Sequence, residues 1–127
     1  MYYKDVKNNQ IVKNVINEEE LLGRVDGDYE LLSELLSLFI EELPLQLQDI
    51  EMAIKNEDCE KLRMCVHRLK GAVGNLAAEE AYELAAQIEL FASQGDLKSA
   101  RYIYPNLKGQ LRLVDEAIKK MINNNGF

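Results

Sequence analysis

From residue 18 onward, apolar residues recur at helical spacing with almost no interruption. Strand-like alternation is missing, and the chain has only two prolines, Pro44 and Pro105. The breaks between the apolar segments are short, and short connections favour antiparallel neighbours. The pattern therefore predicts an all-α fold: an antiparallel up-down four-helix bundle with a short extra helix at its N-terminal end.

Capping residues and turn signals place the expected helices. In chain order they are a short helix after Asn17, a long one after Asp28, one after Asp58, one over 78–94 and a last one after the turn at 94–96. Pro44 is expected to kink or interrupt the long helix, and Pro105 to bend the last one. We assign the bundle to residues 17–122, between a polar, irregular extension at 1–16 and a tail at 123–127.

Composition excludes several classes of protein. A formal net charge of -7 argues against a nucleic-acid binder, which would present a basic surface. The first 15 residues lack the apolar run of a signal peptide, and no stretch approaches the ~18 apolar residues of a membrane helix. Cys59 and Cys65 are expected to stay reduced, because they lie on different faces of one helix. We expect a cytoplasmic monomer that makes no membrane contact.

The stretch "CVHRLKGAVGNL", residues 65–76, contains the only histidine of the chain, His67. The buried stripe expected for its helix consists of Leu62, Val66, Leu69, Val73 and Leu76. At about 100° per residue, His67 falls about 140° from Leu62, outside that stripe. The same lateral face also carries Arg63, Lys70, Gly71 and Gly74.

The two glycines on this face need an explanation, because each costs about 0.5–1 kcal/mol against alanine inside a helix. They could clear a space in which a large partner approaches the imidazole. They could instead let a neighbouring helix pack closely. The residues alone leave both interpretations open.

A neutral imidazole is a nucleophile that can carry a covalent intermediate. If it carried a phosphoryl group, Lys70 one turn away could neutralise part of the negative charge, and Arg63 could assist from the preceding turn. Arg68 projects in another direction and is a weaker candidate. The alternative is a surface histidine that has no role.

The segment "HRLKGAVGNLAA" resembles the signature of histidine-containing phosphotransfer (HPt) domains, H-x-L-K-G followed by small residues and an asparagine–apolar pair. The resemblance extends over about residues 18–122. It implies an antiparallel four-helix bundle whose phosphoaccepting histidine, His67, is exposed midway along a helix. It assigns the lysine beside the phosphate to Lys70 and small docking-face positions to Gly71 and Gly74. Ala77 departs from the family, which often has glycine there.

The resemblance also implies that two proteins supply different parts of the reaction. A receiver domain, sometimes part of a hybrid histidine kinase, holds a phosphoryl group on an aspartate with a magnesium ion. The histidine takes the group and passes it to another receiver. This chain would then need no cofactor or metal of its own, and it would be a phosphotransfer intermediate without a nucleotide site. No glycine-rich nucleotide loop or magnesium-binding carboxylate cluster stands out in the sequence.

The sequence also allows three alternatives to be compared with this hypothesis. The first is a kinase-substrate domain of the chemotaxis type, in which an ATP-dependent histidine kinase phosphorylates His67 directly. The second is a structural or adaptor bundle that no longer transfers phosphate, which the intact H-x-L-K-G disfavours. The third is a di-iron carboxylate bundle, which needs Glu-x-x-His pairs. Met64 occupies the required glutamate position, and there is no second histidine.

Overall fold

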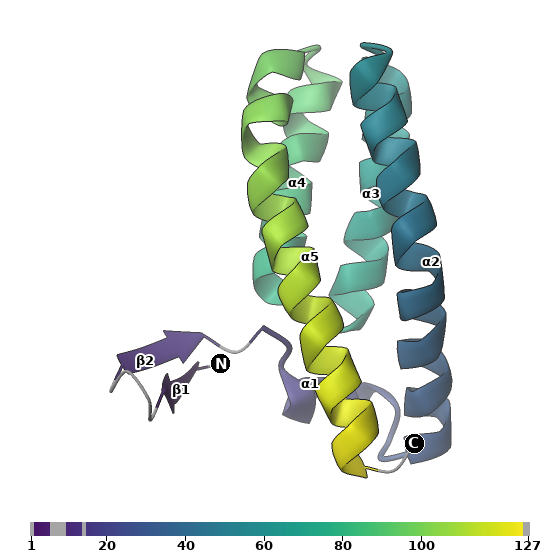
Figure 1. Ribbon diagram of the computed structural model, residues 1–127, viewed down its shortest axis with the longest axis vertical. Coiled ribbons are helices and arrows are strands. Elements are labelled where there is room, and N and C mark those ends of the chain that lie inside the picture. The colour runs from purple at the N-terminus through teal and green to yellow at the C-terminus, as the bar shows by residue number, and fades with distance from the viewer. Residues whose placement is uncertain (1, 6–9, 14, 126–127) are drawn as a thin grey trace.

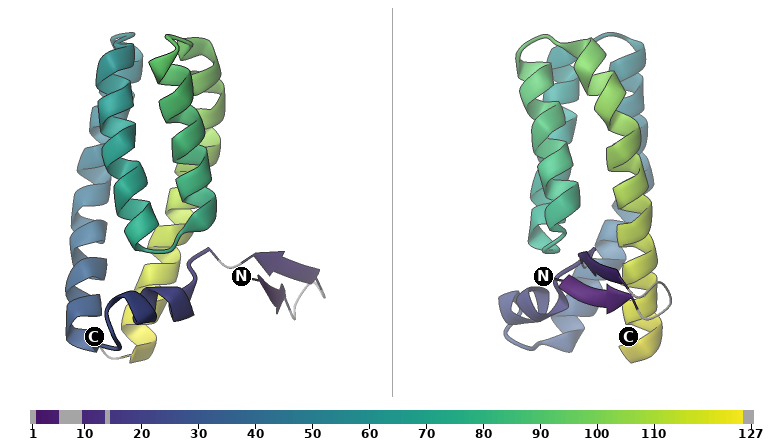
Figure 2. Two further views of the ribbon diagram at one scale, coloured as in Figure 1. Left: turned by 180° about the vertical axis from the view of Figure 1, so that it is seen from behind. Right: turned by 90° about the vertical axis from the view of Figure 1, so that its left-hand side faces the viewer.

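The computed structural model describes residues 2–5, 10–13 and 15–125. The helices in this part of the chain are α1 (Glu18–Arg24), α2 (Tyr29–Lys55), α3 (Cys59–Asn75), α4 (Glu79–Ser93) and α5 (Leu97–Asn125). The predicted bundle is confirmed: α2 to α5 run up and down as antiparallel neighbours, and short α1 lies across one end (Figure 1). Figure 2 shows α3 and α4 side by side from behind, and this pair packs most closely.

The helices begin where their capping side chains predict. Asn17, Asp28 and Asp58 each accept a hydrogen bond from the backbone amide three residues later, at 3.0–3.1 Å. Asp96 does the same for α5 at 3.1 Å. Each such cap typically contributes about 1 kcal/mol to helix stability. The polar residues between the apolar segments therefore fix both the helix starts and the short turns.

Pro44 and Pro105 both lie inside helices, and of the kink or interruption expected at Pro44 only the interruption is excluded. Helix α2 is continuous from Tyr29 to Lys55, so Pro44 does not interrupt it. Pro44 is exposed, while Leu43 and Ile50 bury their side chains on both sides of it and hold the helix in register. Similarly, α5 contains Pro105 and extends to Asn125, beyond the expected end at residue 122.

The extension, expected to be irregular, contains an antiparallel pair of strands, β1 (Tyr2–Asp5) and β2 (Gln10–Lys13). Tyr2 pairs with Lys13, and Asp5 pairs with Gln10. Each strand has four residues, too few for alternation to stand out in the sequence. The tyrosines, isoleucine and valine in them are nevertheless good strand formers.

The core runs along the axis of the bundle. The buried stripe predicted for α3 is confirmed, since Leu62, Val66, Leu69, Val73 and Leu76 are all buried. Leu31 of α2 is exposed, whereas α5 buries Ala100 and Tyr104. Both cysteines are free thiols, as predicted. None of the described helices is long and apolar enough to cross a membrane.

Helices α2 and α5 make fewer contacts than the other long neighbours, and a polar cluster joins them. The Tyr104 hydroxyl donates to a Glu51 carboxylate oxygen at 2.6 Å, and Lys108 Nζ lies 3.1 Å from the same oxygen. The bonds from Tyr104 and Lys108 lower the pKa of Glu51. Burial, and then the bond to Glu51, raise the pKa of Tyr104. The cluster therefore holds a charged carboxylate at the α2–α5 seam.

We predict that Tyr104→Phe lowers the free energy of unfolding by about 1 kcal/mol, because the substitution removes a hydrogen bond to a charged group at little cost in volume. Urea denaturation would measure the change. Tyr102→Phe is the matched control, since Tyr102 is 81% exposed on the same helix. Equal stability of the two variants would contradict a role for the Tyr104 hydroxyl in joining α2 to α5.

Candidate functional site

His67 lies midway along α3, with 65% of its side chain exposed. The buried residues of the helix fix this orientation, because Val66 and Leu69 point into the core and leave His67 on a lateral face. The lateral face lies beside α4, the helix that packs most closely against α3. The structure therefore presents the imidazole to solvent on a rigid helix and not on a loop.

A carboxylate on α4 holds the imidazole of His67. Nδ1 of His67 lies 3.0 Å from Glu89 Oε1 and 3.2 Å from Oε2. Burial raises the pKa of Glu89, but hydrogen bonds from Lys70 and His67 outweigh it and leave the pKa below its usual value. An ionised carboxylate only accepts hydrogen bonds, so Nδ1 must carry the proton in this contact. In the neutral ring the lone pair is then on Nε2.

Lys70 completes a cluster with His67 and Glu89. Its Nζ lies 3.0 Å from Glu89 Oε2 and 5.9 Å from the centre of the Tyr82 ring. The side chains of Lys70 and Glu89 are 22% and 19% exposed, so water screens their ion pair less than a surface pair. The Glu89 carboxylate contacts both the His67 ring and the Lys70 ammonium, so it keeps these two groups on one side of α3. We call these three residues the histidine cluster.

Arg63, the second predicted phosphate neighbour, lies one turn before His67 on the same helix. Its guanidinium bonds Glu60 at 2.6 and 3.1 Å, which raises the pKa of Arg63 and lowers that of Glu60. Glu89 makes a smaller electrostatic contribution to the pKa of Arg63. Arg63 therefore adds positive potential near the histidine cluster, while its hydrogen bonds go to a different carboxylate.

The two glycines of this face turn out to differ. A Cβ at Gly71 would meet nothing within 4 Å, so Gly71 leaves open surface one turn after His67. A Cβ at Gly74 would lie 3.2 Å from Cδ2 of Tyr82. Gly74 also accepts a hydrogen bond at its carbonyl from Arg24 of α1. Gly71 therefore leaves open surface beside His67, whereas Gly74 lies against the Tyr82 ring of α4.

Sequence reasoning missed Glu89 and Tyr82. Both lie on α4, seven residues apart and therefore on one face, but no pattern in α4 alone connects them to His67. The packing register of α3 against α4 brings them there. Ala77 takes the left-handed conformation, with φ 56°, in the turn between these two helices. This explains why glycine would suit the position and why alanine is strained there.

The described residues contain no group of three or more His, Cys, Asp or Glu side chains placed to hold a metal ion. The histidine cluster has one imidazole and one carboxylate, and Lys70 already occupies that carboxylate. The chemistry available at this site is therefore that of an exposed nitrogen nucleophile beside a cation.

Known proteins similar to this chain are helical bundles as well. The family model described as "Hpt domain" matches residues 34–123. Histidine-containing phosphotransfer protein B from Pseudomonas aeruginosa PAO1 has a similar structure, with a TM-score of 0.81, 19% identity, and coverage of 87% of this chain and 96% of that one. For the HPT domain of the Hpt sensor hybrid histidine kinase from Shewanella the TM-score is 0.77, with 20% identity and coverage of 87% and 95%. No curated protein sequence matches the chain.

Fold and site together define a helical bundle that carries an exposed histidine for group transfer. The chain belongs to the Hpt domain family. Members of this family are histidine phosphotransfer intermediates of phosphorelays and interact with receiver domains. The expectation drawn from "HRLKGAVGNLAA" is thereby confirmed at the level of the family, its fold and its role.

The two glycines should respond differently to alanine. Gly71→Ala should raise the free energy of unfolding by about 0.5–1 kcal/mol, because it improves helix propensity and meets no neighbour. Gly74→Ala should raise the free energy of unfolding by less, since the Tyr82 ring must shift to make room for the new Cβ. Gly109→Ala in α5, where a Cβ also meets nothing within 4 Å, is the control for propensity alone. Urea denaturation showing the same gain at Gly74 as at Gly71 would contradict the packing role of Gly74.

Glu89→Gln should destabilise the fold by about 1 kcal/mol near pH 7, since it weakens the bonds to His67 and Lys70. The pKa of Glu89 is lower in the folded state than in the unfolded state. Its contribution is therefore present above the unfolded pKa and is lost as pH falls through the folded pKa. The stability difference between wild type and variant, measured by urea denaturation, should shrink below about pH 4. A difference independent of pH from 7 to 3 would contradict this.

Proposed function

We propose that this protein accepts a phosphoryl group on Nε2 of His67 from the aspartyl phosphate of one receiver domain and passes it to the aspartate of another. The observation that carries the proposal is the contact between Nδ1 of His67 and Glu89, which leaves the lone pair on the exposed ring's other nitrogen. The ring is thus oriented before a partner arrives.

The transfer is an in-line exchange at phosphorus. The Nε2 lone pair attacks the phosphorus of the acyl phosphate, a P–N bond forms, and the P–O bond to the receiver aspartate breaks. The aspartate leaves as a carboxylate with the electron pair. The ring becomes cationic while it keeps its proton on Nδ1, and the Glu89 carboxylate 3.0 Å away stabilises that charge. Onward transfer reverses these steps on the second receiver.

Lys70 is the group that meets the phosphoryl oxygens. Glu89 holds its ammonium on the His67 side of α3, and an ammonium can form charge-assisted hydrogen bonds to phosphate. Arg63 contributes positive potential from the previous turn. Gly71 supports the same proposal, because the open surface there lets the receiver approach the imidazole without meeting a side chain.

The proposal assigns the magnesium ion to the receiver and none to this chain. It also assigns no nucleotide site to the chain, which acts as an intermediate and not as an enzyme. Response-regulator receivers, including one within a hybrid histidine kinase, are the proposed partners. A cytoplasmic, monomeric state belongs to the same proposal.

We predict that His67→Gln abolishes acid-labile, base-stable phosphate incorporation from receivers phosphorylated by a small-molecule donor with magnesium. Lys70→Ala should slow transfer about tenfold or more, because it removes a charge that stabilises the transferred group. Lys98→Ala is the matched control, an exposed lysine at the start of α5. The initial rate of label transfer is the measurement.

Label that persists in His67→Gln would show that another residue accepts the phosphate. Labelling of wild type by an ATP-dependent histidine kinase but by no phosphorylated receiver would replace the proposed donor with a kinase. In either case the folded state of each variant should be checked by urea denaturation, since His67 and Lys98 are exposed and their replacement should leave the fold intact.

A further inference from the structure

A groove runs along the seam between α2 and α5, the neighbouring long helices that make the fewest contacts with each other. It has a volume of about 840 Å³, and its apolar floor consists of Ile40, Leu43 and Leu47 of α2 with Leu111 of α5. Leu43 and Leu111 are buried, whereas Ile40 and Leu47 are only partly covered by the bundle. We call this site the α2–α5 groove. Its floor offers apolar surface that a further element could cover.

Three residues that weaken helices line the α2–α5 groove. The chain has only two prolines, Pro44 and Pro105, and both line the groove together with Gly109 of α5. Proline inside a helix removes a backbone hydrogen bond, and glycine there loses more conformational entropy than other residues. A Cβ at Gly109 would meet nothing within 4 Å, so packing inside the bundle does not require glycine at this position. These compact side chains keep the walls of the groove low, where longer ones would fill it.

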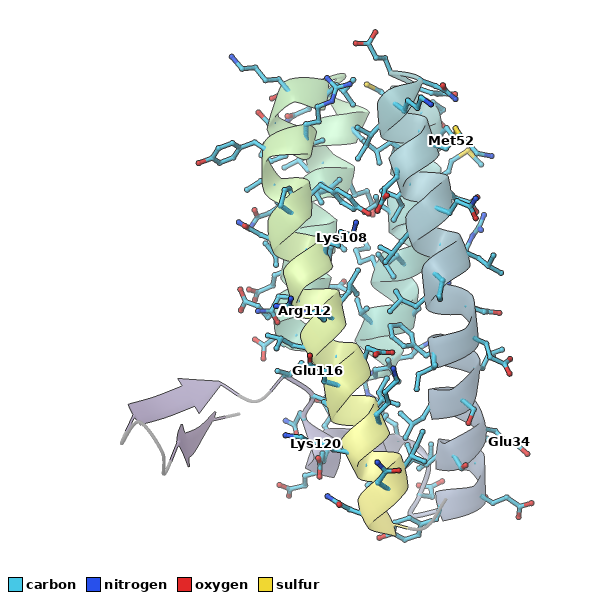
Figure 3. All side chains as sticks on the ribbon, viewed as in Figure 1. Glu34, Met52, Lys108, Arg112, Glu116 and Lys120 are labelled. Atoms are coloured by element: carbon cyan, nitrogen blue, oxygen red, sulfur yellow. The ribbon has the colours of Figure 1, made fainter. Side chains whose placement is uncertain are left out.

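A row of cations borders the groove on α5. Lys108, Arg112 and Lys119 line it, as does the acidic Asp115, so the described lining carries an excess of positive charge. Figure 3 shows Lys108 between α5 and α2, and Arg112 one turn further along α5. Lys108 pairs with Glu51, and Lys119 pairs with Asp115, but the two lysines remain 54% and 61% exposed. Arg112 is exposed and forms no ion pair with any other described residue.

The spacing of these cations matches that of a second helix. They are four and seven residues apart, so they follow one line along α5 at intervals of about 6 and 10 Å. An acidic helix laid along the groove repeats its carboxylates at the same intervals and can place its apolar face on the floor. A small anionic amphiphile has one charged head, which cannot meet a row of cations that extends over about 16 Å. The pattern of charge therefore favours a helix as the occupant.

The α2–α5 groove and the histidine cluster lie on opposite sides of the bundle. In Figure 1, α2 and α5 are in front and α3 and α4 lie behind them, and Figure 2 shows the pair α3 and α4 from the other side. His67 and Glu89 belong to α3 and α4. A protein seated in the groove would therefore leave the imidazole open to a receiver.

We propose that the α2–α5 groove binds an acidic amphipathic helix of a partner protein and so anchors this chain while His67 remains free to exchange phosphoryl groups. Only the clause about exchange rests on the proposed function. The carboxylates of the partner helix would pair with Arg112, and then with Lys108 and Lys119, because exposed ion pairs such as theirs are weak and can be exchanged. Charge complementarity of this kind gives specificity for an acidic partner.

The first experiment measures the binding of two fluorescein-labelled helical peptides of about 18 residues, long enough to span about 27 Å. Both have leucines along one face; one has glutamate on the flanks of that face and the other has lysine. Fluorescence anisotropy with the full chain at about 0.15 M salt should show at least about tenfold tighter binding of the glutamate peptide. Equal affinity of the wild type for the two peptides would overturn the proposal.

A charge reversal tests the cationic border. Arg112→Glu should weaken binding of the glutamate peptide at least about tenfold, because it replaces the cation that has no partner. Lys98→Glu is the matched control, an exposed lysine of α5 that does not line the groove, and it should bind as the wild type does. Both positions are exposed, so the fold should stay intact. Undiminished binding by Arg112→Glu would contradict recognition by this border.

Filling the groove tests the site itself. Gly109→Leu should weaken binding of the glutamate peptide at least about tenfold, because the new side chain enters the open space of the groove. The fold should be retained, since leucine is a better helix former than glycine and meets no neighbour at its Cβ. Gly23→Leu in α1, where a Cβ also meets nothing within 4 Å, is the matched control. Equal binding by the two leucine variants would overturn the groove as the site.

Two other occupants would give different results, and either result would overturn the proposal. Dodecanoate that binds the wild type more tightly than the glutamate peptide, and that Gly109→Leu excludes, would assign the groove to a small anionic amphiphile. A wild-type dimer in sedimentation equilibrium that Gly109→Leu abolishes would assign it to a second copy of this chain.

The last measurement separates the groove from phosphotransfer. A saturating concentration of the glutamate peptide should leave the initial rate of His67 labelling by a phosphorylated receiver unchanged. A rate that falls in proportion to the bound peptide would place the peptide beside His67 and overturn the groove as its site. Absence of labelling with and without peptide would count against the proposed function alone, because peptide binding is measured without phosphate.

Discussion

The site depends on one carboxylate, that of Glu89 on α4, which contacts two side chains of the neighbouring helix α3. Glu89 accepts from Nδ1 of His67 and pairs with Nζ of Lys70. This arrangement requires α3 and α4 to pack in one register, and Gly74 helps to set that register because its missing side chain gives room to the Tyr82 ring. The orientation of one imidazole therefore follows from core packing, one close glycine contact and one ion pair.

Much of the fold and part of the site could be predicted from the sequence because they depend on local rules. The stripe from Leu62 to Leu76 has the period of a helix, and it alone decides that His67 points outward. Asn17, Asp28 and Asp58 cap their helices through amides only three residues away. Interactions between residues only a few positions apart can be recognised in a short stretch of sequence, and so can the "HRLKG" segment itself.

The remaining features depend on interactions between distant segments. Glu89 is 22 residues from His67, and only the helix packing brings them together. Pro44 removes one backbone donor, but buried neighbours such as Leu43 and Ile50 outweigh that loss. In each case tertiary packing prevailed over a local preference.

The charges of the histidine cluster suit a group that must be passed on. A phosphoryl group on His67 would find in Lys70 a cation whose charge Glu89 already balances. An unpaired lysine would bind the phosphoryl group more tightly in the ground state, and tight ground-state binding raises the barrier to the next transfer. The shared carboxylate thus orients the nucleophile and also limits how strongly the product is held. A relay intermediate needs both, because it must accept the group from one partner and release it to another.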